Sequence, residues 1–397
     1  MRSSPLTALI LAALGAFGPT RVAAMQFPDD RAVESLLRNR IEEGRGIGIV
    51  VGLREADGRT RVVFAGSAGK GKRPLGSQTI FEIGSITKVF TGTLLAQMVD
   101  RGEVGLSDPV AKYLPYGVRV PAWGTREITL RDLAKHRSAL PRLPTNMGGA
   151  DPGDPYASYT AEKLYAFLSA FELTRPIDSV FEYSNLGVGL LGHALSRAAG
   201  GSYETVVRER ILDPLRMNKT GVELKADVSE WMAQGHNARN RPVPAWSSGV
   251  LVGAGGLRAD VLDMLRFLDA NIGEPDSDLE RSMRAAHRRS SAPANPQSAV
   301  PAIGLTWLIQ PIGNKTVLWH NGGTGGFRSF IAFDPDREVG VVVLANSSHS
   351  VDDIGMHLLV PSIPLTPSKR KPTGAILVGL AVVVGIVVFA MWKTSRD

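Results

Sequence analysis

A serine and a lysine three residues apart, Ser85 and Lys88, form the pattern in this chain with the clearest capacity for chemistry. After Gly84 the apolar spacing becomes helical, so both side chains should lie on one face at the start of a helix. A serine hydroxyl needs a neighbouring base to act as a nucleophile, and a partly buried lysine with a lowered pKa could be that base. The free N–H groups of the helix N-terminus could stabilise an oxyanion. The alternative is a serine near an N-cap followed by an exposed lysine.

A second polar pair, Tyr183 and Asn185, comes directly before an apolar run with helical spacing. Two residues apart in an extended turn, their side chains can project side by side. A tyrosine could relay a proton where a nearby cation lowers its pKa, and an asparagine could hydrogen-bond a substrate amide. The alternative is a helix entry with a packed aromatic ring.

A third segment begins at His320 and contains four glycines, Gly322, Gly323, Gly325 and Gly326. Glycines at the end of an apolar run allow a substrate to approach a strand backbone closely. Edge N–H groups there could bind an oxyanion or extend the sheet with a peptide-like ligand. The alternative is a tight turn that binds nothing.

Several classes of chemistry are excluded. The chain has no cysteine, which removes disulfides, thiolate metal sites and a cysteine nucleophile. No serine has the Gly-x-Ser-x-Gly context of α/β-hydrolases, and the seven histidines form no zinc-binding motif. The one Gly-x-Gly-x-x-Gly, at 187–192, lies inside the apolar helical run and does not predict a dinucleotide site. We therefore expect no metal and no cofactor.

The composition is that of a globular protein. Of 397 residues, 44% are hydrophobic and 21% charged. The net charge is +7, but Lys and Arg are interleaved with Asp and Glu, and no stripe of basic and aromatic residues occurs. Nucleic acid is not an expected partner.

Both ends of the chain have the composition of targeting segments. Residues 1–24 combine a positive residue, a short apolar run and small residues, which predicts a secretory signal peptide. Residues 374–392 carry no charge and, as a helix of roughly 28 Å, would cross a bilayer. A proline-rich basic tether at 361–373 precedes this transmembrane helix, and a short cytoplasmic tail, 393–397, follows it. The expected arrangement is an exported body, 25–360, anchored in the cell membrane.

Within the body, β-rich segments occur at both ends and helical segments in the middle. Asp-Gly and Asp-Pro-Asp turns join the β-rich runs 46–53 with 61–65 and 327–333 with 339–345. Helices are expected at 89–99, 161–169, 186–199 and 261–270. This predicts an α/β (α+β) fold, in which an antiparallel sheet built from both chain ends is flanked by helices and carries an inserted, largely helical lobe. Residues 274–301 are expected to be solvated and partly mobile.

Taken together and in this order, the three segments resemble the serine penicillin-recognising family: class C β-lactamases, serine D-alanyl-D-alanine carboxypeptidases and related esterases. Its Ser-x-x-Lys, Tyr-x-Asn and Lys/His-x-Gly motifs match Ser85–Lys88, Tyr183–Asn185 and His320–Gly322. Further matching stretches lie at 128–141, 213–217 and 253–257, and the resemblance covers roughly residues 30–350. It implies a β-lactamase/transpeptidase-like fold.

The resemblance also implies the roles of single residues. Ser85 would be the acylated nucleophile, and Lys88 and Tyr183 would share general acid and base work, with the order of proton transfers left open. Asn185 would hold the substrate amide. The substrate would also contact His320, Gly322 and Gly323, with the backbone N–H groups of Ser85 and Gly323 forming the oxyanion hole.

His320 distinguishes the branches of this family, because class C β-lactamases usually carry Lys-Thr-Gly at this motif. A charged His320, with a reference pKa near 6.5, would be a weaker anchor for a substrate carboxylate than lysine. The leading hypothesis is a D-alanyl-D-alanine carboxypeptidase acting on peptidoglycan stem peptides. The alternatives are a β-lactamase or esterase acting on β-lactams or small esters and, from a different class, a non-catalytic penicillin-binding sensor module.

Overall fold

The computed structural model describes residues 27–148, 151, 153–288 and 302–367. The predicted signal peptide, transmembrane helix and cytoplasmic tail lie outside these residues. Within the described residues, no helix is both long and apolar enough to cross a membrane.

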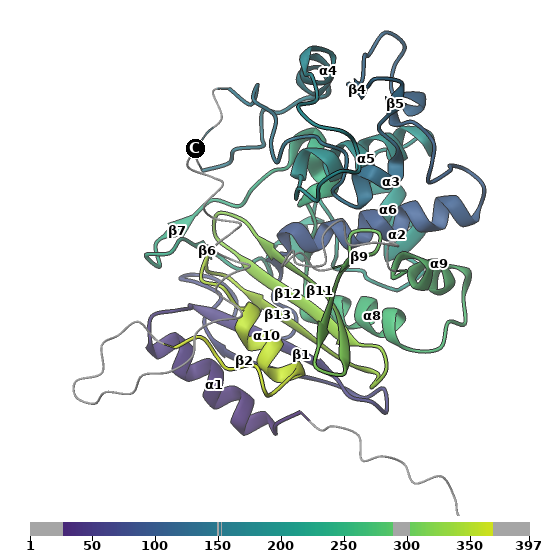
Figure 1. Cartoon of the computed structure of the whole chain (residues 1–397). Coiled ribbons are helices and arrows are strands. Elements are labelled where there is room, and N and C mark those ends of the chain that lie inside the picture. Colours follow the sequence, from purple (N-terminus) through teal and green to yellow (C-terminus); the bar gives the residue numbers. More distant parts are fainter. Residues whose placement is uncertain (1–26, 149–150, 152, 289–301, 368–397) are drawn as a thin grey trace, which may run out of the picture.

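Strands from both ends of the chain form one seven-stranded antiparallel sheet, as the sequence predicts (Figure 1). Its spatial order is β2-β1-β13-β12-β11-β10-β9, and Ile49 of β1 pairs with Ala345 of β13. The strands are β1 (Gly48–Arg54), β2 (Thr60–Gly66), β9 (Ala302–Ile303), β10 (Leu308–Ile312), β11 (Lys315–Gly323), β12 (Arg328–Asp334) and β13 (Val339–Ala345).

Helices cover both faces of this sheet. Every residue of the central strands β1 and β13 is buried, which requires cover on both sides. Helices α1 (Asp30–Glu42) and α10 (Asp352–Leu359) pack on one face, and α8 (Val261–Ile272) packs on the other. In Figure 1, α1 and α10 lie in front of the strands.

The chain between β2 and β9 forms the predicted helical lobe; apart from α8, which packs on the sheet, its helices lie mainly in the upper half of Figure 1. Besides α8, its helices are α2 (Thr87–Asp100), α3 (Leu130–Ala134), α4 (Ala161–Ala170), α5 (Asn185–Ala198), α6 (Tyr203–Val207), α7 (Ala226–Ser229) and α9 (Asp278–Ala286). The Gly-x-Gly-x-x-Gly segment lies inside α5, as expected. There Gly192 lets α5 approach the 3₁₀ segment Gly249–Ala254 so closely that an added Cβ would lie 3.0 Å from the Cα of Gly253.

Two segments differ from expectation. Residues 278–286 form α9, whose apolar side chains Leu279, Met283 and Ala286 are buried, so the prediction of a solvated segment is wrong there. In addition, residues 361–367 of the predicted tether pack onto the body. The Thr366 amide donates to Asp353 (2.8 Å), and Arg45 donates to the Thr366 carbonyl (2.8 Å). These residues extend the body of the protein.

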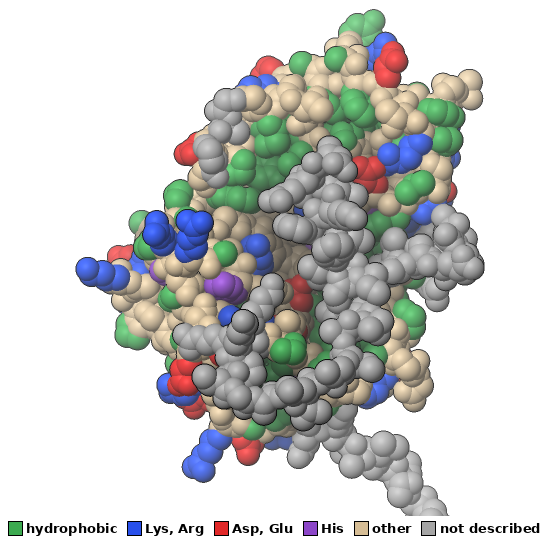
Figure 2. Space-filling model, turned by 60° about the vertical axis from the view of Figure 1, so that its left-hand side comes forward, with side chains coloured by type: hydrophobic (Ala, Val, Ile, Leu, Met, Phe, Trp, Pro, Cys, Tyr) green, Lys and Arg blue, Asp and Glu red, His purple; other side chains and the backbone are tan. Residues whose placement is uncertain are grey.

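Figure 2 shows one face of the molecule. Hydrophobic side chains gather over its upper, helical part. The Lys and Arg side chains visible on this face outside the grey residues lie in separate places, with Asp and Glu also present.

Candidate active site

Ser85 lies in a short 3₁₀ turn, Gly84–Ile86, that leads directly into α2. It is the single residue between Phe81 and Phe90 that is not buried. Gly84 has φ of +49°, a left-handed conformation that favours glycine, and a Cβ there would lie 2.6 Å from the Gly323 nitrogen. The nucleophile candidate and the Gly323 amide are therefore brought together from opposite ends of the chain.

Strand β11 packs against this turn through its backbone. A Cβ on Gly322 would lie 2.0 Å from the Ile83 carbonyl oxygen, and the Ser329 hydroxyl of β12 donates to the same oxygen (2.7 Å). A side chain at position 322 would push the strand away from Ser85.

Among the described residues, one side of the end of β11 has no partner strand. The pairing with β10 runs from Lys315 to Trp319, whereas β11 continues to Gly323 and pairs with β12 throughout residues 318–323. An extended ligand could therefore add to β11 beside Ser85, as the sequence suggested.

The Lys88 side chain is fully buried, and its Nζ has three polar neighbours. It lies 3.0 Å from Ser85 Oγ, 2.9 Å from Asn185 Oδ1 and 2.7 Å from the Ala254 carbonyl oxygen. The 3₁₀ segment packed against α5 thus supplies the third neighbour.

These three contacts indicate how a neutral amine would be oriented. Burial, together with the positive charge of Arg142, lowers the pKa of Lys88 well below its ordinary value. The Ala254 carbonyl and Asn185 Oδ1 can only accept hydrogen bonds, so they would take the two N–H bonds of the neutral amine. The lone pair is left facing the Ser85 hydroxyl, which is the geometry of a general base.

Tyr183 lies beside this pair, with Lys88 Nζ 4.9 Å from the centroid of its ring. Burial raises the pKa of Tyr183 to about 12, although a hydrogen bond with Ser85 and the charge of Arg142 act in the opposite direction. The expectation that a nearby cation would lower this pKa below its ordinary value is therefore wrong, because desolvation is the larger effect. A protonated phenol can donate a proton to a leaving group.

His136 fixes the segment that carries Tyr183 and Asn185. Its Nδ1 accepts from the Ser184 amide (3.0 Å), its carbonyl accepts from the Glu182 amide (2.8 Å), and its ring stacks on that of Tyr183 with centroids 4.4 Å apart. The side-chain amide of Asn185 bridges Lys88 and the Tyr156 hydroxyl, to which Nδ2 donates (3.1 Å).

His320 lies on the same strand as Gly322 and is fully buried. Its Nδ1 is 2.6 Å from the Asn321 carbonyl oxygen, which can only accept, so Nδ1 carries a proton. Burial and the nearby Lys88 lower the pKa of His320 to about 3. The expectation of a positively charged His320 that anchors a carboxylate is therefore wrong. Nε2 is a buried acceptor without a partner in the described part of the chain.

The structure brings together all seven residues singled out in the sequence: Ser85, Lys88, Tyr183, Asn185, His320, Gly322 and Gly323. Sequence reasoning assigned no role to His136, Arg142, Tyr156 or Ala254. His136 and Ala254 lie in the stretches 128–141 and 253–257, so the family resemblance marked their segments. Arg142 and Tyr156 carried no such signal.

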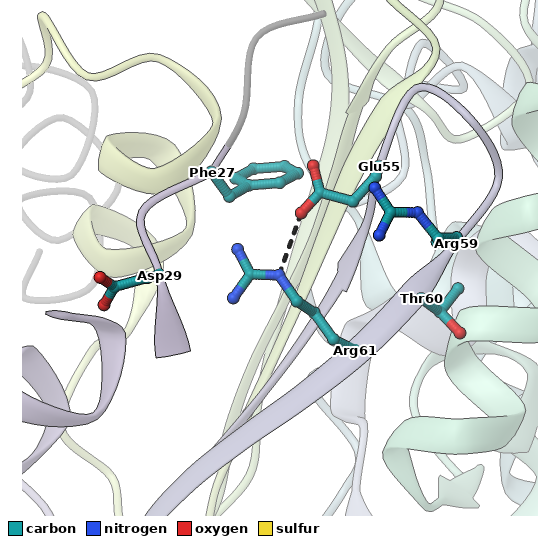
Figure 3. Close-up of a pocket in the computed structure, with 6 residues that line it drawn as sticks. All are labelled: Phe27, Asp29, Glu55, Arg59, Thr60 and Arg61. Carbon is teal, nitrogen blue, oxygen red and sulfur yellow. Dashed lines mark hydrogen bonds and ion pairs between the residues drawn. The ribbon is translucent and has the colours of Figure 1, made fainter. Parts of the chain in front are cut away.

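Across the described residues, no group of three or more His, Asp or Glu side chains could hold a metal ion. A surface cavity of about 450 Å³ lies between the start of α1 and the β1–β2 hairpin, where Arg61 donates to Glu55 (3.0 Å; Figure 3). None of the seven site residues lines this cavity.

Comparison with known proteins shows to which family this chain belongs. The family model described as Beta-lactamase matches residues 33–360, which is most of the chain. The chain belongs to this family. The chain is thus a serine hydrolase of the β-lactamase type.

Relatives of this β-lactamase family member include both of the expected branches. The D-alanyl-D-alanine-carboxypeptidase/endopeptidase AmpH of Escherichia coli is 30% identical over 280 residues, which cover 68% of this chain and 71% of the relative. A β-lactamase of the same species is 27% identical over 307 residues, covering 70% and 78%. A class C β-lactamase structure from Rhodobacter sphaeroides has a TM-score of 0.71 and 26% identity, covering 84% of this chain and 99% of that one.

Proposed function

We propose that this protein hydrolyses D-alanyl-D-alanine-type peptides through an acyl-enzyme on Ser85. The observation that carries the proposal is the contact set of Lys88, whose two acceptor neighbours orient the lone pair of a neutral amine toward Ser85 Oγ. Lys88 takes the hydroxyl proton as Oγ bonds to the scissile carbonyl carbon. The Ser85 and Gly323 amides stabilise the oxyanion.

The second half of the reaction uses Tyr183. When the C–N bond breaks, the leaving nitrogen takes a proton from the Tyr183 hydroxyl, and Lys88 returns its proton to the phenolate. Water then attacks the acyl-enzyme, and the two groups act in the reverse direction. Asn185 holds the acyl-side amide, and His320 offers Nε2 as a neutral acceptor.

Peptides are favoured as substrates by two observations. The relative that is 30% identical is named a carboxypeptidase and endopeptidase. One side of the end of β11 is unpaired within the described part of the chain, which suits an extended substrate. Hydrolysis of β-lactams is the second candidate, because other relatives bear the name β-lactamase.

We also propose that the body is exported and held at the cell membrane by a helix at 374–392. The support is the sequence: a signal-like segment at 1–24 and an uncharged run of sufficient length near the C-terminus. A chain truncated after Pro367 keeps every docked residue of the body. It should be soluble and active, whereas the full chain should fractionate with membranes. A full chain that remains in the soluble fraction would exclude the anchor.

The activity is tested by intact-protein mass spectrometry with benzylpenicillin, followed over time, together with an assay of D-alanine released from a peptide ending in D-Ala-D-Ala. A persistent adduct with D-alanine release indicates a carboxypeptidase, and rapid loss of the adduct indicates a β-lactamase. A persistent adduct with no turnover of any substrate would indicate the sensor module. Ser85→Ala should abolish the adduct and lower turnover by several orders of magnitude. Normal turnover in that variant would exclude Ser85 as the nucleophile.

A further inference from the structure

Arg142 is an exposed cation placed directly at the candidate active site. Its guanidinium carbon lies 5.2 Å from the centroid of the Tyr183 ring. Its backbone is fixed, since its carbonyl accepts from the amides of Asn185 (3.0 Å) and Leu186 (3.2 Å). Arg142 therefore emerges next to two of the residues that would contact the substrate.

Among the described residues, no carboxylate lies within 4 Å of this guanidinium, so no ion pair occupies it. With one face over an aromatic ring, a guanidinium still presents N–H groups along its edge, where they can bind a carboxylate through two parallel hydrogen bonds. Its charge is felt throughout the site, because it lowers the pKa of Lys88 and opposes the raised pKa of Tyr156 and Tyr183.

Other cations near the site are already engaged. Arg328, beside Gly323, is largely buried and donates to the Thr324 and Phe327 carbonyls (both 2.9 Å), and Asp352 balances its charge. Arg137, in the same segment as Arg142, is paired with Asp178. His320 is neutral, as described above.

We propose that Arg142 is a specificity-determining residue that binds a carboxylate of the substrate and so selects anionic substrates over neutral ones of the same size. The inference rests on the proposed function, since it concerns the substrate acylated on Ser85. The carboxylate can lie on the acyl side of the scissile bond or on the leaving-group side.

The test measures second-order acylation rates of the full chain with three penicillins. Benzylpenicillin and its methyl ester differ by the carboxylate on the leaving-group side. Benzylpenicillin and carbenicillin differ by one additional carboxylate on the acyl side. For each pair, we compare the acylation rate of the more anionic penicillin with that of the less anionic one. In Arg142→Gln, this ratio should fall about tenfold for one of the two pairs. The pair that changes shows on which side of the scissile bond the carboxylate binds. Arg142→Lys keeps the charge without the planar fork and should shift the ratio less.

Arg101→Gln is the matched control. Arg101 is exposed and follows the far end of α2, roughly 20 Å from the end that carries Lys88, so its loss should leave both ratios unchanged. The proposal is overturned if both ratios in Arg142→Gln stay within about twofold of the wild type, or if all three compounds slow equally. A wild-type protein that neither forms an adduct with any penicillin nor releases D-alanine from the peptide would instead refute the proposed function.

Discussion

The rings of His136 and Tyr183 stack with their centroids 4.4 Å apart and their planes 30° apart. The same imidazole accepts a hydrogen bond from the amide of Ser184, which is buried. Tyr183 is therefore held in two ways, by a ring against its face and by a bond to the next residue of its backbone. His136 itself has φ of +55°, a conformation that asparagine tolerates better than most residues.

Two variants of His136 separate these contacts. His136→Asn keeps an acceptor for the Ser184 amide but loses the stack, and His136→Phe keeps the stack but leaves the amide unpaired. An unpaired buried amide costs about 1–3 kcal/mol, whereas a stacked aromatic pair contributes about 0.5–1.5 kcal/mol. We expect His136→Phe to lose more of the acylation rate, about 10- to 100-fold, than His136→Asn.

The rates are compared per folded molecule, at a temperature well below the Tm of each variant. If both variants lower only the Tm and acylate at the wild-type rate, His136 stabilises the fold without positioning Tyr183.

Asn185→Asp places a carboxylate where Oδ1 now lies 2.9 Å from Lys88 Nζ. A negative charge this close favours the ammonium form and raises the pKa of Lys88. Since the base must be neutral, the acidic limb of the acylation pH profile should move to higher pH. Asn185→Ala, which adds no charge, should slow acylation without that upward shift. An unmoved limb in Asn185→Asp would mean that Lys88 is not the titrating base.

A buried, neutral His320 should not titrate between pH 5 and 8, because its pKa is lowered to about 3. The KM for an anionic substrate should therefore show no midpoint near pH 6.5. His320→Gln, which is neutral at every pH, should preserve the shape of the wild-type profile.

His320→Lys should lower the Tm, because it places an ammonium where the imidazole is fully buried. It should not gain activity against β-lactams, contrary to what the Lys-x-Gly pattern of class C enzymes would suggest. A wild-type KM that worsens through pH 6.5 and is flattened by His320→Lys would restore the charged role.

At pH 8, replacing Asp352 and replacing its neighbour Asp353 should change the free energy of unfolding in opposite directions. It accepts from Asn321 Nδ2 (2.7 Å), and burial raises its pKa from 3.8 to about 6. The protonated carboxyl of Asp352 stabilises the folded state. This contribution is fully present below pH 3.8 and is lost as the pH rises through about 6. Asp352→Asn should therefore increase the free energy of unfolding at pH 8 by about 1–3 kcal/mol and change it little at pH 4.

Asp353→Asn is the comparison variant. Asp353 forms a buried ion pair with Arg40 (2.5 Å), so its loss should destabilise the protein at pH 8 by about 3–5 kcal/mol. Urea unfolding at both pH values measures both variants. If Asp352→Asn is also destabilising at pH 8, the ionised carboxylate is stabilised by its neighbours.

The sequence alone predicted the fold class and the pairing of its two ends, because these follow from local patterns. Alternating and continuous apolar runs marked β1, β2, β12 and β13, and helical spacing marked α2, α4, α5 and α8. Ser85 and Lys88 are three residues apart, so helical geometry alone brings them together. Only the order of three motifs, compared with a known family, connected them with Tyr183 and His320.

Only the tertiary structure determined which side chains of the site are protonated and which cations lie beside it. The degree of burial is a property of the whole packed chain. The sequence therefore suggested a charge on His320 that burial removes, and allowed for a lowered pKa of Tyr183, which burial instead raises. The contacts of His136 with Ser184 and of Lys88 with the Ala254 carbonyl join residues 48 and 166 positions apart. No local pattern encodes such distances, because they are set by the packing of α5, α2 and β11 around one another.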